Sequence, residues 1–129
     1  MPDATLQRIL YVEDDPDIQA IARVALESVG GFTVETCNSG HSAIAAAAGF
    51  RPELLLIDVM MPDMDGPTTL AALRDLPGLT DTPAIFITAK VQPDEIAQLQ
   101  NHGAVDIITK PFDPMTLSDQ IRRIWDKLP

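Results

Sequence analysis

The chain has one cysteine, few basic residues and no long apolar run, and each shortage excludes a class of protein. The lone Cys37 allows no internal disulfide and lacks the Cys and His spacing of a zinc site, so we interpret it as a buried small apolar side chain. The longest uncharged apolar run, residues 43–50, is too short to cross a bilayer, and no signal-peptide pattern opens the chain. We therefore expect a cytoplasmic protein without membrane insertion.

Basic residues are outnumbered by acidic ones, nine against nineteen, which gives a net charge of −10. A surface this negative repels phosphate backbones, so direct binding to nucleic acid is disfavoured. The chain has 129 residues, of which 46% are apolar, and this is the size and composition of a single globular domain. We expect one domain over residues 1–129, and Met1 with a compact ending favours a stand-alone protein over a piece of a larger one.

Five short apolar runs have the composition of β-strands and lie about twenty to thirty residues apart, as in successive βα units. The predicted strands are 8–12, 32–36, 53–57, 84–88 and 105–109. Residues 9–12, 54–57 and 84–87 are apolar at every position. Strands that are covered on both faces have this pattern, which favours a parallel sheet.

The segments between these strands have helical periodicity. The first predicted helix has an apolar stripe and stops at Gly30-Gly31, and the others cover 41–49 (with Ser39 or Ser42 as the cap), 68–76 and 93–100. The stripe of the first helix consists of Ile18, Ile21, Ala22, Ala25, Leu26 and Val29, and that of the last consists of Leu117, Ile121, Ile124 and Leu128. Five βα units predict an α/β fold, a flavodoxin-like doubly wound (βα)5 sandwich with strand order 2-1-3-4-5. Ligands of such sheets bind at the carboxyl ends of strands one and three.

Carboxylates follow both of these strands. Glu13-Asp14-Asp15 comes after the first strand, and Asp58 comes after the third. Carboxylates that lie close together repel each other. A hard cation such as Mg²⁺, which prefers oxygen ligands, can bind them and neutralise this repulsion. An alternative is that Glu13-Asp14-Asp15 only begins the first helix, whose N-terminus favours negative charge.

Two neighbouring strands end in complementary groups, the Thr88 hydroxyl and the Lys110 ammonium. Taken singly, a helix cap and a solvated surface lysine are the simpler interpretations. Carboxylates, a hydroxyl and a lysine at four strand ends are together what phosphoryl transfer to an aspartate requires.

Four sequence blocks now identify a family. They are ILYVEDD (9–15), LLIDVMMPDMDG (55–66), IFITA (85–89) and IITKPF (107–112). In this order and spacing, the chain resembles the receiver domain of two-component response regulators over nearly its whole length. The resemblance implies a phosphorelay switch that takes its phosphoryl group from a sensor histidine kinase or a histidine phosphotransfer protein. It also implies output through contacts with an unidentified downstream protein, and no catalysis beyond the protein's own phosphorylation and slow dephosphorylation.

The resemblance also assigns roles to residues. Asp58 would be the phosphoacceptor, and Mg²⁺ (with Mn²⁺ as an alternative) would be held by Glu13, Asp14, Asp58 and the main-chain carbonyl of Met60. The phosphoryl-binding and switch residues would be Thr88, Ala89 and Lys110, with a cis peptide before Pro111. The kinase would dock at the mouth of the site and on the first helix, and the signalling face would include 93–100 and 113–127. We expect the exposed docking residues of that helix to be Gln19, Arg23 and Glu27.

Three positions bear on how this chain switches. Receiver domains usually have an aromatic residue where this chain has Ile107, so we hypothesise that the loop after Thr88 and the next helix carry the signal instead. Met60 and Lys90 occupy the positions that tune the lifetime of the phosphate. Because a thioether cannot orient water by a strong hydrogen bond, we predict slow dephosphorylation.

Two other functions compete with this one. Asp63-Met64-Asp65-Gly66 superficially matches the nucleophile motif of haloacid-dehalogenase-type phosphatases, although that motif must follow a strand directly and Pro62 intervenes. A degenerate, non-phosphorylated receiver or a flavin-binding module is the other alternative, but no acidic, acceptor or lysine residue is missing, and a flavin site needs small residues after strand one. We assign no role to His41 or His102, and we expect Trp125 to pack at the edge of the last helix.

Overall fold

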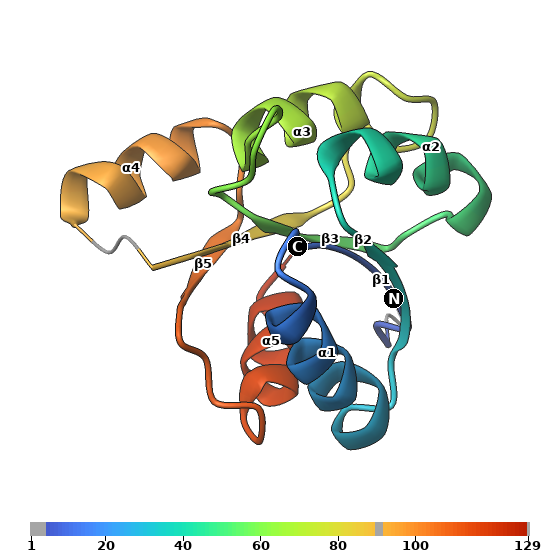
Figure 1. Cartoon of the computed structure of the whole chain (residues 1–129), viewed down its shortest axis with the longest axis vertical. Helices are drawn as coiled ribbons and strands as arrows, with labels where there is room; N and C mark the ends of the chain where they lie inside the picture. Colours follow the sequence, from blue (N-terminus) through green and yellow to red (C-terminus); the bar gives the residue numbers. More distant parts are fainter. Residues whose placement is uncertain (1–4, 90–91, 129) are drawn as a thin grey trace.

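The computed structural model describes residues 5–89 and 92–128, which form a parallel sheet between two layers of helices (Figure 1). The sheet has the order β2-β1-β3-β4-β5, and each pairing is parallel. This confirms the predicted α/β, flavodoxin-like topology. The strands are β1 (Arg8–Val12), β2 (Thr33–Cys37), β3 (Leu54–Asp58), β4 (Ala84–Thr88) and β5 (Asp106–Thr109).

The helices divide between the two faces of the sheet. Figure 1 shows α2, α3 and α4 on one face and α1 and α5 on the other. Their bounds are α1 (Pro16–Val24), followed by the π-helical turn η1 (Ala25–Val29), α2 (Gly40–Phe50), α3 (Gly66–Arg74), α4 (Pro93–Asn101) and α5 (Leu117–Asp126). Among the described residues, no helix combines the length and the apolar character needed to cross a membrane.

Each face of the sheet has its own apolar core, because successive side chains of a strand point to opposite faces. Ile9, Leu54 and Ile85 pack with α1 and α5 in one core. Leu10, Leu55 and Phe86 pack with α2 and α3 in the other. The central strands are therefore buried on both faces, which explains why their sequences are apolar at every position.

Three strand boundaries differ from the prediction by one residue. The second strand spans 33–37 rather than 32–36, because the amide of Phe32 donates to Leu26 in the turn that ends the preceding helix. The third spans 54–58 rather than 53–57, and the fifth begins at Asp106 rather than Val105. Asp58 is thus the last residue of β3, in register with Ile87 of β4.

The first helix is the main departure from the predicted helices. Ala22, Ala25 and Leu26 are buried as expected, but Ile21 is 50% exposed and Val29 is also exposed. The chain leaves α-helical geometry at η1, where Gly30 bonds back to Ala25, so the later residues no longer follow the 3.6-residue period.

The other helix ends lie close to their predicted places. Ser39 caps α2, and Ser42 completes a capping box with it, so both candidate serines take part. The third helix begins at Gly66 rather than Thr68, because the Asp65 side chain caps it. Leu128 lies beyond the end of α5.

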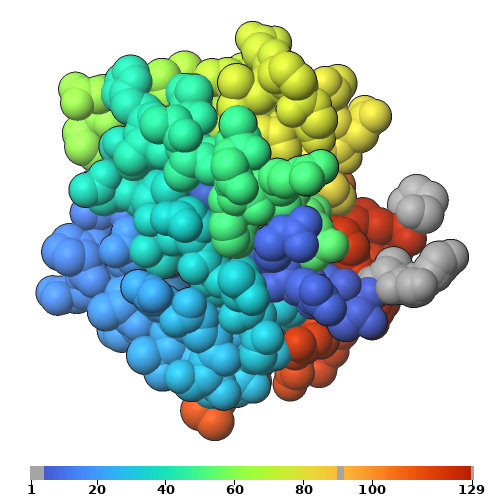
Figure 2. Space-filling model, turned by 90° about the vertical axis from the view of Figure 1, so that its right-hand side faces the viewer, coloured from blue at the N-terminus to red at the C-terminus, as the bar shows by residue number. Residues whose placement is uncertain are grey.

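The strands are parallel, so their amino ends lie together at the edge of the sheet opposite to the carboxyl ends, where the acidic residues are. Figure 2 shows the dark-blue segment before β1 against the green segment before β3 on this side. The Glu53 carboxylate accepts hydrogen bonds from the amides of Gln7 and Arg8 and ties these segments together.

Candidate functional site

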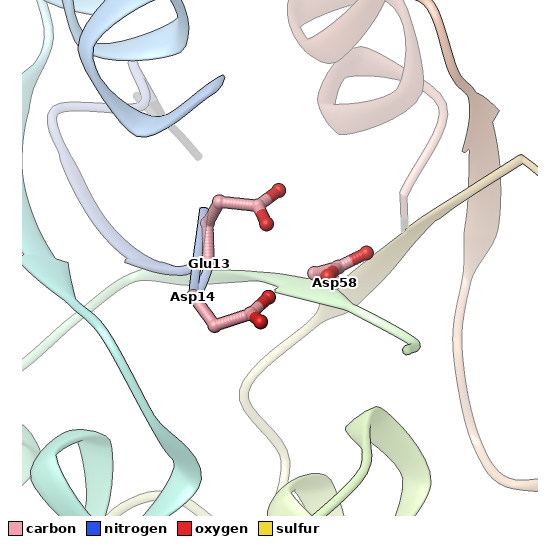
Figure 3. A group of neighbouring side chains, drawn as sticks. All are labelled: Glu13, Asp14 and Asp58. Carbon is pink, nitrogen blue, oxygen red and sulfur yellow. The ribbon is translucent and has the colours of Figure 1, made fainter. Parts of the chain in front are cut away.

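Three carboxylates meet at the carboxyl ends of β1 and β3. One oxygen each from Glu13, Asp14 and Asp58 lies within 4.8 Å of the other two. Figure 3 shows Glu13 and Asp14, consecutive in the chain, with their carboxylates directed to the side where Asp58 lies. Glu13 is 1% exposed and Asp58 is 3% exposed, whereas Asp14 is exposed to solvent. The structure therefore brings together the acidic residues that were predicted to converge at the switch point of the sheet.

Asp15 has a different position from its two neighbours. Its carboxylate caps α1 by accepting hydrogen bonds from the amides of Asp17 (2.9 Å) and Ile18 (3.3 Å). The alternative that these acidic residues begin the first helix thus holds for Asp15 alone.

Lys110 lies between the two buried carboxylates. Its Nζ is 2.9 Å from Glu13 Oε1 and 2.9 Å from Asp58 Oδ1, and its side chain is 17% exposed. The Lys110–Pro111 peptide bond is cis, the geometry that the family resemblance implies. The lysine is a half-buried ion-pair partner and not the solvated surface residue of the alternative interpretation.

The pKa values of these groups reflect burial opposed by ion pairing. Burial raises the pKa of Asp58 and of Glu13, and Lys110 counteracts this only in part, so both remain above their ordinary values. Burial lowers the pKa of Lys110, but its hydrogen bonds and Coulomb attraction to Glu13 and Asp58 outweigh that effect and raise it. An additional cation at this site would therefore favour the ionised carboxylates.

Glu13 is held by further contacts that sequence reasoning missed. Its Oε1 accepts from the Tyr11 hydroxyl (3.4 Å), and its Oε2 accepts from the Asp15 amide (3.2 Å). Its main-chain carbonyl accepts from Gln19 Nε2 (3.2 Å), although Gln19 was expected to face a partner. A tyrosine two residues before Glu13 was the available signal, because residues two apart in a strand share a face.

The remaining predicted site residues surround this cluster. Thr88 ends β4 and is buried, and Ala89 after it is exposed. Met60 is 60% exposed and lines a pocket of about 190 Å³ together with Thr88 and the α4 residues Gln98 and Leu99. Lys90 lies outside the described residues.

Ile107, the atypical switch position, is half-buried and packs against the core beneath α2 and α3. It lies in register with Phe86 of β4.

The segment 62–66 is a turn and a helix cap. Asp63 adopts a left-handed conformation (φ 67°), and Asp65 Oδ1 accepts from the amide of Thr68 at 2.9 Å. A Cβ on Gly66 would lie 2.8 Å from the Asp58 carbonyl oxygen, so this position requires glycine. Because Asp63 and Asp65 do not extend a strand, nothing in this geometry favours the phosphatase alternative.

The other residues considered above lie outside the acidic cluster. Cys37 is buried, as predicted, and burial together with the charge of Glu35 raises its pKa to about 11. His41 and His102 are exposed. Trp125 is half-buried and packs against the core beneath α1 and α5, which agrees with its predicted place at the edge of the last helix.

The donor set fits a hard divalent cation. Three carboxylates and one ammonium leave two negative charges when all four groups are ionised, and two of the carboxylates are nearly inaccessible to water. Mg²⁺ and Mn²⁺ prefer carboxylate and carbonyl oxygens. The exposed Asp14 leaves the cluster open to solvent on one side.

The chain is similar to known proteins over most of its length. A family model described as the response regulator receiver domain matches residues 9–122. The chain is 33% identical over 127 residues to the DNA-binding dual master transcriptional regulator RpaA of Synechocystis, covering 96% of this chain and 52% of RpaA. It is 33% identical over 120 residues to the DNA-binding response regulator MtrA of Mycolicibacterium smegmatis, covering 93% of this chain and 51% of MtrA. The chain thus spans about half the length of these relatives.

A solved structure shows the same similarity in three dimensions. The chemotaxis response regulator CheY4 of Vibrio cholerae superposes with a TM-score of 0.85 at 30% identity, over 93% of this chain and 99% of CheY4. The family match covers most of the chain, and the predicted strand order and acidic cluster are both present. This chain therefore belongs to the response regulator receiver domain family.

Proposed function

We propose that Asp58 is the phosphoacceptor of a phosphorelay. It would take its phosphoryl group from a phosphohistidine of a sensor histidine kinase or a histidine phosphotransfer protein. The observation that carries this proposal is the buried Asp58 carboxylate, which lies 2.9 Å from Lys110 and next to Glu13 and Asp14. Residues 1–129 would act as one receiver domain in the cytoplasm, with no catalysis beyond the protein's own phosphorylation and slow dephosphorylation.

The transfer exchanges one bond to phosphorus for another. An oxygen of Asp58 attacks the phosphorus, the bond to the histidine nitrogen breaks, and the donor recovers its imidazole while Asp58 becomes an acyl phosphate. Lys110 pairs with Asp58 before the transfer and donates to the phosphoryl oxygens after it. The Thr88 hydroxyl also donates to the phosphoryl oxygens after the transfer. The main-chain amide of Ala89 is a further donor for the phosphoryl group.

Mg²⁺ or Mn²⁺ would be held by Glu13, Asp14, Asp58 and the carbonyl of Met60. When bound, the cation neutralises charge on the phosphoryl oxygens and on the carboxylate cluster. Glu13 and Asp14, at the end of β1, supply negative charge that offsets the charge of the cation. The burial of Asp58 limits access of water to the acyl phosphate.

The phosphodonor would dock at the mouth of the site and on α1, where Arg23 is exposed. Arg23 and Glu27 pair with each other at 2.9 Å, and Gln19 bonds to the Glu13 carbonyl. An apolar pocket of about 310 Å³ also opens next to Lys110. It is lined by Ile18, Ile21, Ala89, Lys110, Pro111, Phe112 and Pro114. An apolar surface that includes Lys110, the ion-pair partner of Asp58, suits a helical partner carrying the phosphohistidine.

The output would begin at Thr88. We propose that Thr88 shifts toward the phosphoryl group and that the loop after Thr88 and α4 move with it. Ile107 has no aromatic ring, so the signal does not pass through the rotation of a ring at this position. The pocket shared by Thr88, Met60 and α4 supports this route. Amide chemical shifts recorded with and without a phosphate mimic test it, and unchanged shifts over residues 88–103 would rule it out. The faces at 93–100 and 113–127 would contact the downstream protein.

Labelling with a small phosphodonor tests the acceptor. The full chain is incubated with acetyl phosphate and Mg²⁺, and the intact mass is measured for wild type, Asp58→Asn and Asp63→Asn. We expect one phosphoryl group on wild type and Asp63→Asn, and none on Asp58→Asn or with a chelator present. Labelling that depends on Asp63, or turnover of a phosphomonoester, would support the phosphatase alternative, and absence of any labelling would support the degenerate receiver.

A further inference from the structure

Tyr11 is a polar residue in the buried part of β1, and the chemistry proposed above gives it no role. Its side chain is 0% exposed, and its neighbours along the strand, Leu10 and Val12, are apolar. It lies in the core that packs against α1 and α5. A buried phenol normally requires a hydrogen-bond partner, because an unpaired hydroxyl in the core costs free energy.

The hydrogen-bond partner of the Tyr11 hydroxyl is Glu13, a residue of the acidic cluster. Its hydroxyl donates to Glu13 Oε1 over 3.4 Å, and the same oxygen accepts from Lys110 Nζ at 2.9 Å. The other oxygen of Glu13, Oε2, accepts from the amide of Asp15 at 3.2 Å. The carboxylate is therefore held from β1, from the start of α1 and from the end of β5.

These three donors restrict a side chain that would otherwise be adaptable. Glu13 has three side-chain torsions and stands beside Asp58, whose negative charge repels it. The ion pair with Lys110 pulls Glu13 toward β5, and the Tyr11 hydroxyl anchors the same oxygen from within the sheet. Groups that hydrogen-bond a metal-binding carboxylate orient it and affect metal affinity.

We propose that Tyr11 is a positioning residue, whose hydroxyl holds the Glu13 carboxylate in the orientation that binds the divalent cation. This inference rests on the proposed function, because it assumes that the cluster binds Mg²⁺. Tyr11 itself does not touch the cation or the phosphoryl group. Its effect passes through Glu13 alone.

Tyr11→Phe separates positioning from packing. The phenylalanine ring keeps the apolar contacts with α1 and α5 and removes only the hydroxyl. We expect Mg²⁺ to bind about fivefold more weakly, since one net hydrogen bond contributes about 1 kcal/mol and 1.4 kcal/mol is tenfold. The labelling rate with acetyl phosphate should return to within twofold of wild type at saturating Mg²⁺, because Asp58 and Lys110 are unchanged.

Thr69→Val provides a matched control. The Thr69 hydroxyl is also fully buried, but it lies in α3 and has no hydrogen-bond partner among the residues that the structure describes. Deleting it tests the general effect of losing a buried hydroxyl. We expect the Mg²⁺ affinity of Thr69→Val to equal that of wild type.

The experiment has two readouts on full-length protein. Mg²⁺ is titrated into wild type, Tyr11→Phe and Thr69→Val and followed by amide chemical shifts. The carboxylate carbon of Glu13 is followed by NMR in the metal-free proteins, where only Tyr11→Phe should shift it. If Tyr11→Phe binds Mg²⁺ as tightly as wild type, or leaves the Glu13 signal unchanged, the positioning role is wrong while the proposed function stands. If wild type binds no Mg²⁺, both fall.

Discussion

Replacing Lys110 by methionine would leave two buried carboxylates without their shared cation. Methionine preserves the length and apolar stem of the side chain, so the change removes mainly the ammonium. Removal of one partner from a buried ion pair costs about 3–5 kcal/mol. Lys110 is 17% exposed and the carboxylates can take up a proton, so we expect a loss of about 2–3 kcal/mol in the free energy of unfolding near pH 7.5.

The loss should depend on pH in a defined direction. Lys110 lowers the pKa of Asp58 and Glu13, so its removal raises both pKa values further above their unfolded values. An acid with a raised pKa binds more protons in the folded state, so stability falls as pH rises above about 4, where the unfolded groups ionise. The destabilisation by Lys110→Met should therefore be smaller at pH 5 than at pH 8. The titration of Lys110 itself lies above this window, since its pKa is raised.

Urea unfolding of wild type, Lys110→Met and the control Lys127→Met at pH 5, 6.5 and 8 measures this effect. Lys127 is exposed at the end of α5, and its replacement should change stability by less than about 0.5 kcal/mol. Mg²⁺ should recover much of the loss at pH 8, because ligand binding stabilises the folded state. Equal losses at pH 5 and pH 8, or a loss no larger than that of Lys127→Met, would refute the charge balance described here.

Three further predictions follow from single residues. Gly66→Ala places a Cβ 2.8 Å from the Asp58 carbonyl oxygen and should lower the free energy of unfolding by about 1–3 kcal/mol. The control Gly49→Ala in α2 meets nothing within 4 Å and should raise the free energy of unfolding by up to about 1 kcal/mol. Equal effects of the two changes in urea unfolding would contradict the close approach at Gly66. Burial raises the pKa of Cys37 to about 11, so iodoacetamide at pH 8 should modify it slowly in the folded protein and rapidly in urea, and fast modification of the native protein would show that the thiol is accessible. Met60→Asn introduces a side chain that can orient water, so phosphorylated protein should lose its phosphate faster than wild type, and an unchanged decay rate would argue against a role for Met60 in phosphate lifetime.

Much of the fold could be predicted because the central strands are buried on both faces. The unbroken apolar runs at 9–12, 54–57 and 84–87 leave few alternatives to a parallel sheet, and the strand order then determines where its ligand site lies. Strand ends were less predictable, since pairing register decides them. Asp58 belongs to β3 because β4 offers it a partner in Ile87, which local sequence does not reveal.

Within the site, residue type was more predictable than side-chain direction. Glu13, Asp14 and Asp15 are adjacent acidic residues, yet two of them face Asp58 and the third caps α1. Gln19 differs from expectation for the same reason, because its hydrogen bond to the Glu13 carbonyl depends on the relative placement of β1 and α1. The π-helical turn at 25–29 also has no signature in the apolar periodicity, which continues through it.

Locating the phosphoryl group along the chain tests the central claim most directly. Protein labelled with acetyl phosphate and Mg²⁺ is treated with borohydride, which reduces an aspartyl phosphate to homoserine, and the modified residue is found by tandem mass spectrometry of peptides. The acidic cluster at the ends of β1 and β3 predicts homoserine at position 58 and nowhere else. Homoserine at position 63, or an unmodified Asp58 in protein that carries a phosphoryl group, would contradict it.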